Sequence, residues 1–346
     1  MSEEYAQPPF IDLALPPAIV LSHLQLIVFY TLSITLDVTL LKKQKELPFT
    51  SKQLTVFLVL IRTLLPLIFI SSNMLLNVLY AAVPWFLASY YTRLPVSQLS
   101  LSKAIQTLVL ITTEPTSLPL YKIRCRGAAT CCLGILKWTF MLMFIDPLLP
   151  HRTVFALYYS WFHPMSLIYT LLYGIKAYCL LGAIDFCMGL EQVVFGLNMV
   201  SLFNSPILSI SPRDFWSKRW NKVVRNLLHK QVFTLAVEQE KKSARKYKKG
   251  WSGLLNHRYG RGLASFFVSG LFHELIIMSV CRRLTLENLV FFSLQGLAVL
   301  FEINLRQGAL KQEPERKSRA ICIAAQIMFM ACTGRLFLGP FLRYLE

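Results

Sequence analysis

Nine long apolar runs dominate this sequence and restrict it to one class of fold. They cover residues 18–41, 53–70, 74–91, 127–149, 153–175, 177–203, 263–280, 286–305 and 320–338. A helix needs about 20 apolar residues to cross the ~30 Å hydrocarbon core of a bilayer. Only 16% of the residues are charged, whereas soluble domains carry about 25%. We therefore predict an all-α fold, a polytopic transmembrane helical bundle that forms a single membrane-embedded domain over residues 1–346.

Four basic connections predict the orientation of these runs. They cover residues 42–52, 93–126, 213–261 and 306–319, and the positive-inside rule places all four in the cytosol. Three apolar runs separate the second connection from the third, so simple alternation cannot put both on one side. We expect about eight crossings plus one interfacial or re-entrant segment. Residues 177–203 are the candidate for that segment, because Asp185 and Glu191 interrupt them.

The third connection holds most of the positive charge. It contains fourteen Lys and Arg and three acidic residues, a surplus of +11 in a chain of net charge +18. Its cluster KKSARKYKK, residues 241–249, is typical of a surface that binds anionic lipid headgroups. Residues 213–261 are therefore predicted to form a basic cytosolic segment against the membrane.

The start of this segment, SPRDFWSKRWNKVVRN, differs from the lysine cluster. Pro212 and Asp214 suit the beginning of a helix. Trp216 and Trp220 stand four residues apart, so we expect them on one face of that helix. An ordinary interfacial anchor would use the same two tryptophans and is the alternative interpretation.

An ionisable pair, His273 and Glu274, lies near the middle of the run at residues 263–280. In a helix over residues 262–281, His273 lies about 16 Å along the axis, close to the midplane of the bilayer. Ionisable residues at that depth are costly, and their default interpretation is functional. A packing histidine bonded to another helix is the alternative. Glu274 points about 100° away around the helix, and we expect it to pair with a neighbouring helix. Structural pairing is likewise expected for the other acids in apolar runs: Asp37, Asp185, Glu191 and Glu302.

The two motifs together resemble a known family. DFWSKRWN (residues 214–221), followed about fifty residues later by SFFVSGLFHEL (residues 265–275), is similar to the membrane-bound O-acyltransferase superfamily, and within it to the wax-synthase-like branch. The resemblance implies that His273 is the intramembrane catalytic histidine. It also implies that Asn221 is the polar residue that closes the FW-x-x-RW motif. The implied activity is acyl-CoA-dependent esterification of a hydrophobic alcohol, either a long-chain alcohol or a sterol.

Ester formation from a thioester requires a base for the alcohol, stabilisation of the oxyanion and binding of CoA. A buried neutral His273 would supply the base. Asn221 either polarises the thioester carbonyl or orients His273. No Ser-His-Asp or Cys-His signature is evident, so we expect direct attack by the alcohol rather than an acyl-enzyme. The cations of the motif are candidate phosphate ligands, and the expected acyl-CoA contacts are Arg213, Trp216, Lys218, Arg219, Trp220 and Lys222.

The expected partners are acyl-CoA, a hydrophobic alcohol and membrane lipids, in the endoplasmic reticulum membrane. No nucleic acid, metal or bound cofactor is expected, since acyl-CoA acts as a co-substrate; the oligomeric state is left open. An O-acetyltransferase acting on a terpenoid or another secondary-metabolite alcohol is the alternative within this class. A membrane transporter would use His273 and the buried acids as an ion path, and a lipid-binding scaffold would need only the basic cluster.

Overall fold

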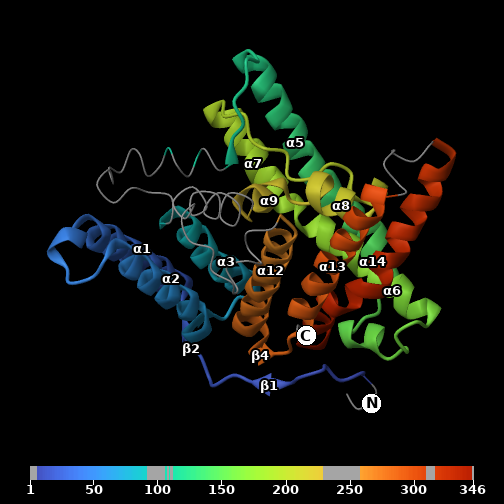
Figure 1. The fold of residues 1–346 in the computed structure, drawn as a ribbon, viewed down its shortest axis with the longest axis horizontal. Helices are drawn as coiled ribbons and strands as arrows, with labels where there is room; N and C mark the ends of the chain where they lie inside the picture. Colours follow the sequence, from blue (N-terminus) through green and yellow to red (C-terminus); the bar gives the residue numbers. More distant parts are fainter. Residues whose placement is uncertain are drawn as a thin grey trace. The chain divides into compact units, whose positions relative to one another are not determined.

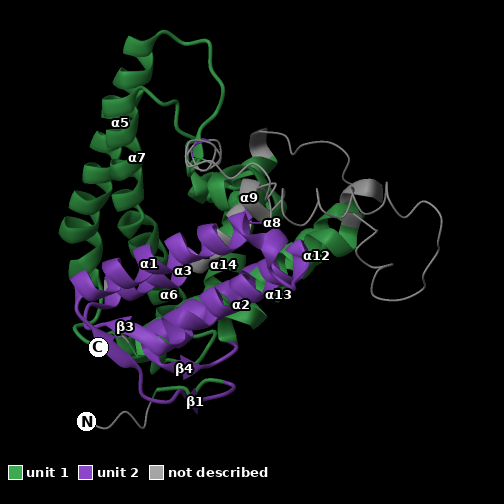
Figure 2. Ribbon diagram, turned by 90° about the vertical axis from the view of Figure 1, so that its left-hand side faces the viewer, with its two compact units in different colours: residues 1–9, 111–268, 287–346 green, residues 10–110, 269–286 purple. Residues whose placement is uncertain are grey.

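The computed structural model describes residues 6–91, 112–228, 258–308 and 316–344, together with Gln106 and Val109. The chain divides into two compact units (Figure 2). Unit 1 comprises residues 1–9, 111–268 and 287–346, and unit 2 comprises residues 10–110 and 269–286. The division falls inside helix α12 (Arg258–Cys281). The lysine cluster at residues 241–249 lies outside the described residues.

Unit 2 is built on three apolar helices: α1 (His23–Lys42), α2 (Ser51–Ile68) and α3 (Met74–Tyr91). Ser22 and Thr50 begin α1 and α2, each in a capping box with the glutamine three residues later, which satisfies the first amides of both helices. Helices α2 and α3 correspond to the apolar runs at residues 53–70 and 74–91. Two small strand pairs complete the unit: β1 (Leu13–Ala14) with β4 (Arg283–Leu284), and β2 (Ile19–Leu21) with β3 (Phe69–Ser71).

A buried polar group joins the three helices of unit 2. The guanidinium of Arg62 donates through Nε to Asp37 Oδ2 at 2.7 Å, and its Nη2 bonds Asp37 Oδ1. Tyr91 Oη donates to the same carboxylate at 2.6 Å. Asp37 is completely buried, and buried charges are tolerated when they are paired and hydrogen-bonded. The expectation of structural pairing for this acid is therefore confirmed.

Unit 1 contains most of the remaining elements (Figure 2). Its long helices are α5 (Leu120–Phe140), α6 (Pro164–Leu180), α7 (Gly182–Phe195), α13 (Glu287–Gly308) and α14 (Arg316–Tyr344), with the first part of α12. Its short elements are η4 (Met141–Ile145), η5 (Asp146–Leu148), η6 (Thr153–Leu157), η7 (Pro206–Leu208), α8 (Pro212–Asp214), η8 (Phe215–Arg219) and α9 (Lys222–Leu228); η2 (Gln44–Glu46) belongs to unit 2.

Seven helices within the described residues are long and apolar enough to cross a membrane, namely His23–Lys42, Ser51–Ile68, Leu120–Leu148, Pro164–Phe195, Tyr259–Cys281, Glu287–Leu305 and Ser318–Tyr344. The protein is thus a polytopic helical membrane protein, as predicted. The expected boundary between the runs at 153–175 and 177–203 is wrong, because α6 continues across it to Leu180 and the chain resumes its helix at Gly182.

Helices α5 and α7 lie side by side and antiparallel (Figure 1). Four glycines form their contact. A Cβ on Gly134 would lie 2.5 Å from Gly182 O, and one on Gly127 would lie 2.8 Å from Gly189 O. Each pair of glycines on a helix is seven residues apart, so both fall on one stripe. Small residues of this kind let membrane helices approach closely.

Both ends of this helix pair are defined by local signals. Gly196 ends α7 in the left-handed conformation, with φ of 67°, which glycine adopts without a Cβ penalty. Residues just beyond the helices then pair with each other: Thr113 bridges Met199 in antiparallel fashion, and Val200 N donates to Thr112 O at 2.8 Å. The start of α5 and the end of α7 therefore lie at the same end of unit 1.

Candidate functional site

The tryptophan-containing motif begins as predicted, with a capped helix. Ser211 Oγ accepts from Asp214 N at 3.1 Å, and Pro212 occupies the first helical position. The carboxylate of Glu302, from α13, accepts from Ser211 Oγ and from Arg213 N, both at 2.8 Å. A negative group at this end complements the unpaired amides of the first turn. Structural pairing of Glu302 is thereby confirmed.

The helix does not continue as the spacing of the tryptophans predicted. Residues 215–219 form a π-helical turn, and Trp220 is already extended, with φ of −99° and ψ of 131°. The two rings consequently have different surroundings. Trp216 donates from Nε1 to Gln295 Oε1 at 3.0 Å and lies 5.7 Å from Phe266, whereas Trp220 stacks 5.3 Å from Phe215. The expectation that both share one helical face is wrong.

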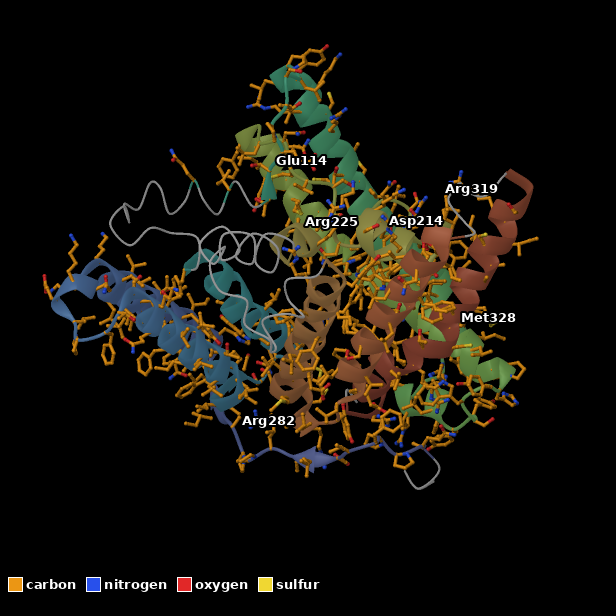
Figure 3. The ribbon with its side chains drawn as sticks, viewed as in Figure 1. Glu114, Asp214, Arg225, Arg282, Arg319 and Met328 are labelled. Atoms are coloured by element: carbon orange, nitrogen blue, oxygen red, sulfur yellow. The ribbon has the colours of Figure 1, made fainter. Side chains whose placement is uncertain are left out.

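The cations of the motif also differ in their surroundings. Arg219 donates to Asp214 Oδ2 at 2.6 Å and to the carbonyls of Asn204 and Ser205 at 3.2 Å, and its side chain is 14% exposed. Arg213 and Lys218 are exposed, and Lys222 is half-buried. Asp214, the acidic partner of Arg219, is labelled in Figure 3. Arg219 is thus bound within the motif, while the first two cations face outward.

Asn221 closes the motif in a strained backbone conformation. Its φ is 33°, a region in which asparagine is enriched among non-glycine residues. Its Oδ1 accepts from Val224 N at 3.2 Å, so the side chain caps α9. Oδ1 is thus used by the cap, and the amide nitrogen Nδ2 is the hydrogen-bond donor of this side chain. Asn221 is half-buried.

His273 belongs to the part of α12 that lies in unit 2. Its Nδ1 is 2.8 Å from Ser269 O, one turn earlier in the same helix. A carbonyl oxygen only accepts, so Nδ1 carries the proton and, in the neutral ring, Nε2 carries the lone pair. The helix begins at Arg258, four residues before the expected Gly262. In the span Tyr259–Cys281, His273 lies three residues, or about 4.5 Å, beyond the central residue.

Glu274 was expected to pair with a neighbouring helix, but its hydrogen-bond partners in the described part of the chain lie elsewhere. Its Oε1 accepts from Thr285 N at 2.8 Å, Thr285 Oγ1 at 3.1 Å and Leu286 N at 2.7 Å. These groups belong to the turn that follows its own helix. Arg282, labelled in Figure 3, fixes the same turn by donating to Leu67 O at 2.7 Å. Glu274 therefore has a structural role in ending α12.

The structure adds residues to the motif that the sequence patterns did not single out. Gln295 and Thr333 continue the contact of Trp216, since Gln295 Nε2 donates to Thr333 Oγ1 at 3.0 Å. In the sequence, the only signal for Gln295 and Thr333 was that each is a polar residue within an otherwise apolar run. Within the described residues, no three His, Cys, Asp or Glu side chains are grouped closely enough to hold a metal ion.

Comparison with known proteins supports the resemblance seen in the two motifs. Residues 199–294 match the model of the membrane bound O-acyl transferase family, a range that contains both the tryptophan motif and His273. The chain is 31% identical over 159 residues to the probable long-chain-alcohol O-fatty-acyltransferase 2 of Arabidopsis thaliana, covering 46% of this chain and 43% of that protein.

Two further relatives match the chain with similar identity and coverage. The probable long-chain-alcohol O-fatty-acyltransferase 1 of Arabidopsis thaliana is 32% identical over 154 residues, covering 44% of this chain and 42% of that protein. The long-chain-alcohol O-fatty-acyltransferase of Simmondsia chinensis is 29% identical over 157 residues, with 45% and 42% coverage. The chain thus spans less than half the length of these curated relatives. The predicted similarity to wax-synthase-like membrane-bound O-acyltransferases is confirmed.

Proposed function

We propose that this protein is an acyl-CoA-dependent O-acyltransferase that esterifies a long-chain alcohol with a fatty acyl group in the endoplasmic reticulum membrane. The observation that carries the proposal is the match over residues 199–294, which includes the only histidine of the apolar run at residues 263–280. The names of the similar proteins supply the substrate class.

His273 has the chemistry of the general base in this proposal. The Nδ1–H bond to Ser269 O holds the ring in the tautomer whose Nε2 can accept a proton. The alcohol gives its proton to Nε2 while its oxygen attacks the thioester carbonyl carbon. The C–S bond then breaks, and the CoA thiolate takes the proton from the imidazolium, which leaves the ester and free CoA.

Asn221 and the outward cations have separate roles in the proposal. The Nδ2 amide of Asn221 donates to the carbonyl oxygen of the acyl donor as negative charge develops on it. Arg213 and Lys218 contact the phosphates of CoA, because both side chains are exposed and cations form strong charge-assisted hydrogen bonds with phosphate. Trp216, Trp220, Lys222 and Arg219 shape this region through their contacts within the motif.

His273→Ala tests the proposal directly. Microsomes that contain the protein are supplied with a panel of acyl-CoAs and alcohols, and the esters are quantified by mass spectrometry. We expect the wild type to form a fatty ester of a long-chain alcohol. The variant should insert normally and lose about 10²–10⁴-fold in rate, as expected when a general base is removed.

His151→Ala is the matched control, since His151 is exposed in the loop after η5, and it should retain wild-type activity. More than a tenth of the activity remaining in His273→Ala would contradict the role of this histidine. A wild type that forms no ester from any pair of substrates would overturn the proposed function, and exclusive use of acetyl-CoA would replace the fatty substrate by an acetyl group.

A further inference from the structure

A lysine outside the motif is enclosed by an acid and two aromatic rings of unit 1. Nζ of Lys137, on α5, lies 2.5 Å from Asp185 Oδ2 on α7. The same nitrogen lies 4.0 Å from the ring centre of Tyr178 and 4.9 Å from that of Phe203. The side chains of Lys137 and Asp185 are 6% and 8% exposed. A desolvated ammonium is attracted to the faces of such rings, so this cation fixes both rings.

One of these rings contacts the motif directly. Phe203 lies 5.0 Å from Trp220, and Tyr178 lies 6.3 Å from it. Tyr178 and Phe203 also contact each other edge to face, at 5.2 Å. Aromatic rings attract one another at separations and angles of this kind. The position of Trp220 therefore depends on the two rings that Lys137 holds.

Two backbone hydrogen bonds join the preceding loop to the motif, one on each side of Asn221. The amide of Lys222 donates to Leu202 O at 3.0 Å, and the amide of Asn204 donates to Arg219 O at 2.9 Å. The residue between the two loop positions is Phe203, whose ring lies on Lys137. A shift of this loop therefore shifts the backbone on both sides of Asn221.

We propose that Lys137 and Asp185 are positioning residues, which hold Asn221 in place through Phe203 and Trp220. This inference rests on the proposed role of Asn221 as a donor to the reacting carbonyl. It extends the functional machinery to helices α5 and α7, which lie outside the range that matches the family model. Small errors in position are costly for a group of this kind, since a displacement of about 1 Å can lower the rate about 10²-fold.

The test removes both charges together. A single substitution would leave the other charge buried and unpaired, whereas replacement of a buried pair by apolar residues of similar volume is often neutral for stability. The variant Lys137→Met/Asp185→Leu should therefore fold, as judged by a monodisperse gel-filtration profile. We expect kcat to fall about 10-fold or more, with both KM values within about twofold of wild type.

Phe203 gives an independent route to the same result. Phe203→Leu removes the ring and keeps the ion pair, so it should lower kcat in the same way; Phe203→Tyr keeps the ring and should restore at least half of the activity. The matched control is Lys176→Gln/Asp146→Asn, a second Lys–Asp pair of unit 1, in which both side chains are 32% exposed. This control should stay within about twofold of wild type.

A double-mutant cycle decides whether the effect passes through Asn221. Asn221→Asp keeps an oxygen to cap α9 but has no N–H donor, so its activity should be reduced. If the pair acts through Asn221, adding Lys137→Met/Asp185→Leu to Asn221→Asp should cost less than about twofold more, because interacting sites are not additive. Full additivity, or wild-type kcat in the charge-free variant, would overturn the inference while leaving the proposed function intact. An inactive wild type would instead overturn the proposed function.

Discussion

The side chain of Asn221 suits both the local backbone conformation and the hydrogen-bond donor role proposed for it. Its φ of 33° disfavours most residue types, and its Oδ1 caps the next helix. Asparagine tolerates this conformation and still carries an amide NH₂ group. Aspartate would satisfy the backbone and the cap equally well but could not donate. The sequence left two roles open for Asn221, and the proposal above assigns it the donation to the reacting carbonyl.

The two arginines of the motif should respond differently to substitution by alanine. Arg213→Ala removes an exposed cation, so we expect a higher apparent KM for acyl-CoA, an unchanged KM for the alcohol, and a smaller difference from wild type as salt is added. Arg219→Ala instead leaves the buried Asp214 without its cation, so we expect a lower Tm in detergent and loss of activity towards both substrates.

Kinetics with both substrates varied, together with thermal melting of each variant, would check this contrast. Lys45→Ala serves as a control, because Lys45 lies in the connection between α1 and α2, in unit 2. A selective rise in KM for acyl-CoA in Arg219→Ala, with unchanged Tm, would show that this arginine binds the substrate and would restore the expectation drawn from the sequence.

For single residues, the sequence indicated which ones belong to the motif but not which side chains surround them. Pro212 and Asp214 marked the start of the helix, because helix starts depend on local chemistry. The different surroundings of the Trp216 and Trp220 rings could not be predicted. A π-helical turn followed by an extended residue changes the direction of every later side chain. The partners of Trp216 come from distant parts of the chain, Phe266 in α12 and Gln295 in α13, and spacing within a motif cannot reveal such contacts.

Among the helices, the α5–α7 pair depends on its glycines. A methyl group on Gly134 would approach Gly182 O to 2.5 Å, and a carbonyl oxygen cannot move away without displacing the helix. Gly134→Ala should therefore destabilise the protein and lower its Tm in detergent by several degrees. Gly174→Ala in α6 is the control, because nothing lies within 4 Å of its Cβ position; it should leave the Tm unchanged or raise it. Equal melting temperatures for Gly134→Ala and the wild type would contradict this packing.

Helix positions followed from the apolar runs wherever one run corresponds to one helix. Residues 263–280 and 320–338 lie within α12 and α14, and residues 286–305 lie within α13 except for Leu286. The prediction failed at residues 153–175, where hydropathy alone joins the short η6 to the following helix. Pro164 at the start of α6 and Gly196 at the end of α7 were the usable signals, because both types of residue define helix ends by their backbone conformation. Hydropathy averages over such residues and misses them.

At the scale of the whole molecule, the two apolar runs at residues 153–175 and 177–203 contribute a single candidate span, Pro164–Phe195. Asp185 and Glu191 were the reasons to expect a non-crossing segment at residues 177–203, and Lys137 pairs with the first of these acids within unit 1. Two candidate spans, Leu120–Leu148 and Pro164–Phe195, precede the motif, and the first of them begins within the second basic connection, at Leu120. An even number of crossings returns the chain to the side from which it started, which removes the conflict with the positive-inside rule.

Sidedness tests this arrangement together with the proposed mechanism. CoA is too polar to cross a bilayer, so its binding residues must face the cytosol. The pairing of Thr113 with Met199 puts the start of α5 and the end of α7 on one side, and we expect that side to be cytosolic. Single cysteines replacing Glu114 and Lys218, in a protein whose eight native cysteines are replaced, should react with an impermeant maleimide in sealed microsomes. A cysteine replacing His151 should react only after detergent is added. If Lys218→Cys is protected while His151→Cys reacts, unit 1 has the opposite orientation, and the proposed contact of Arg213 and Lys218 with cytosolic acyl-CoA is wrong.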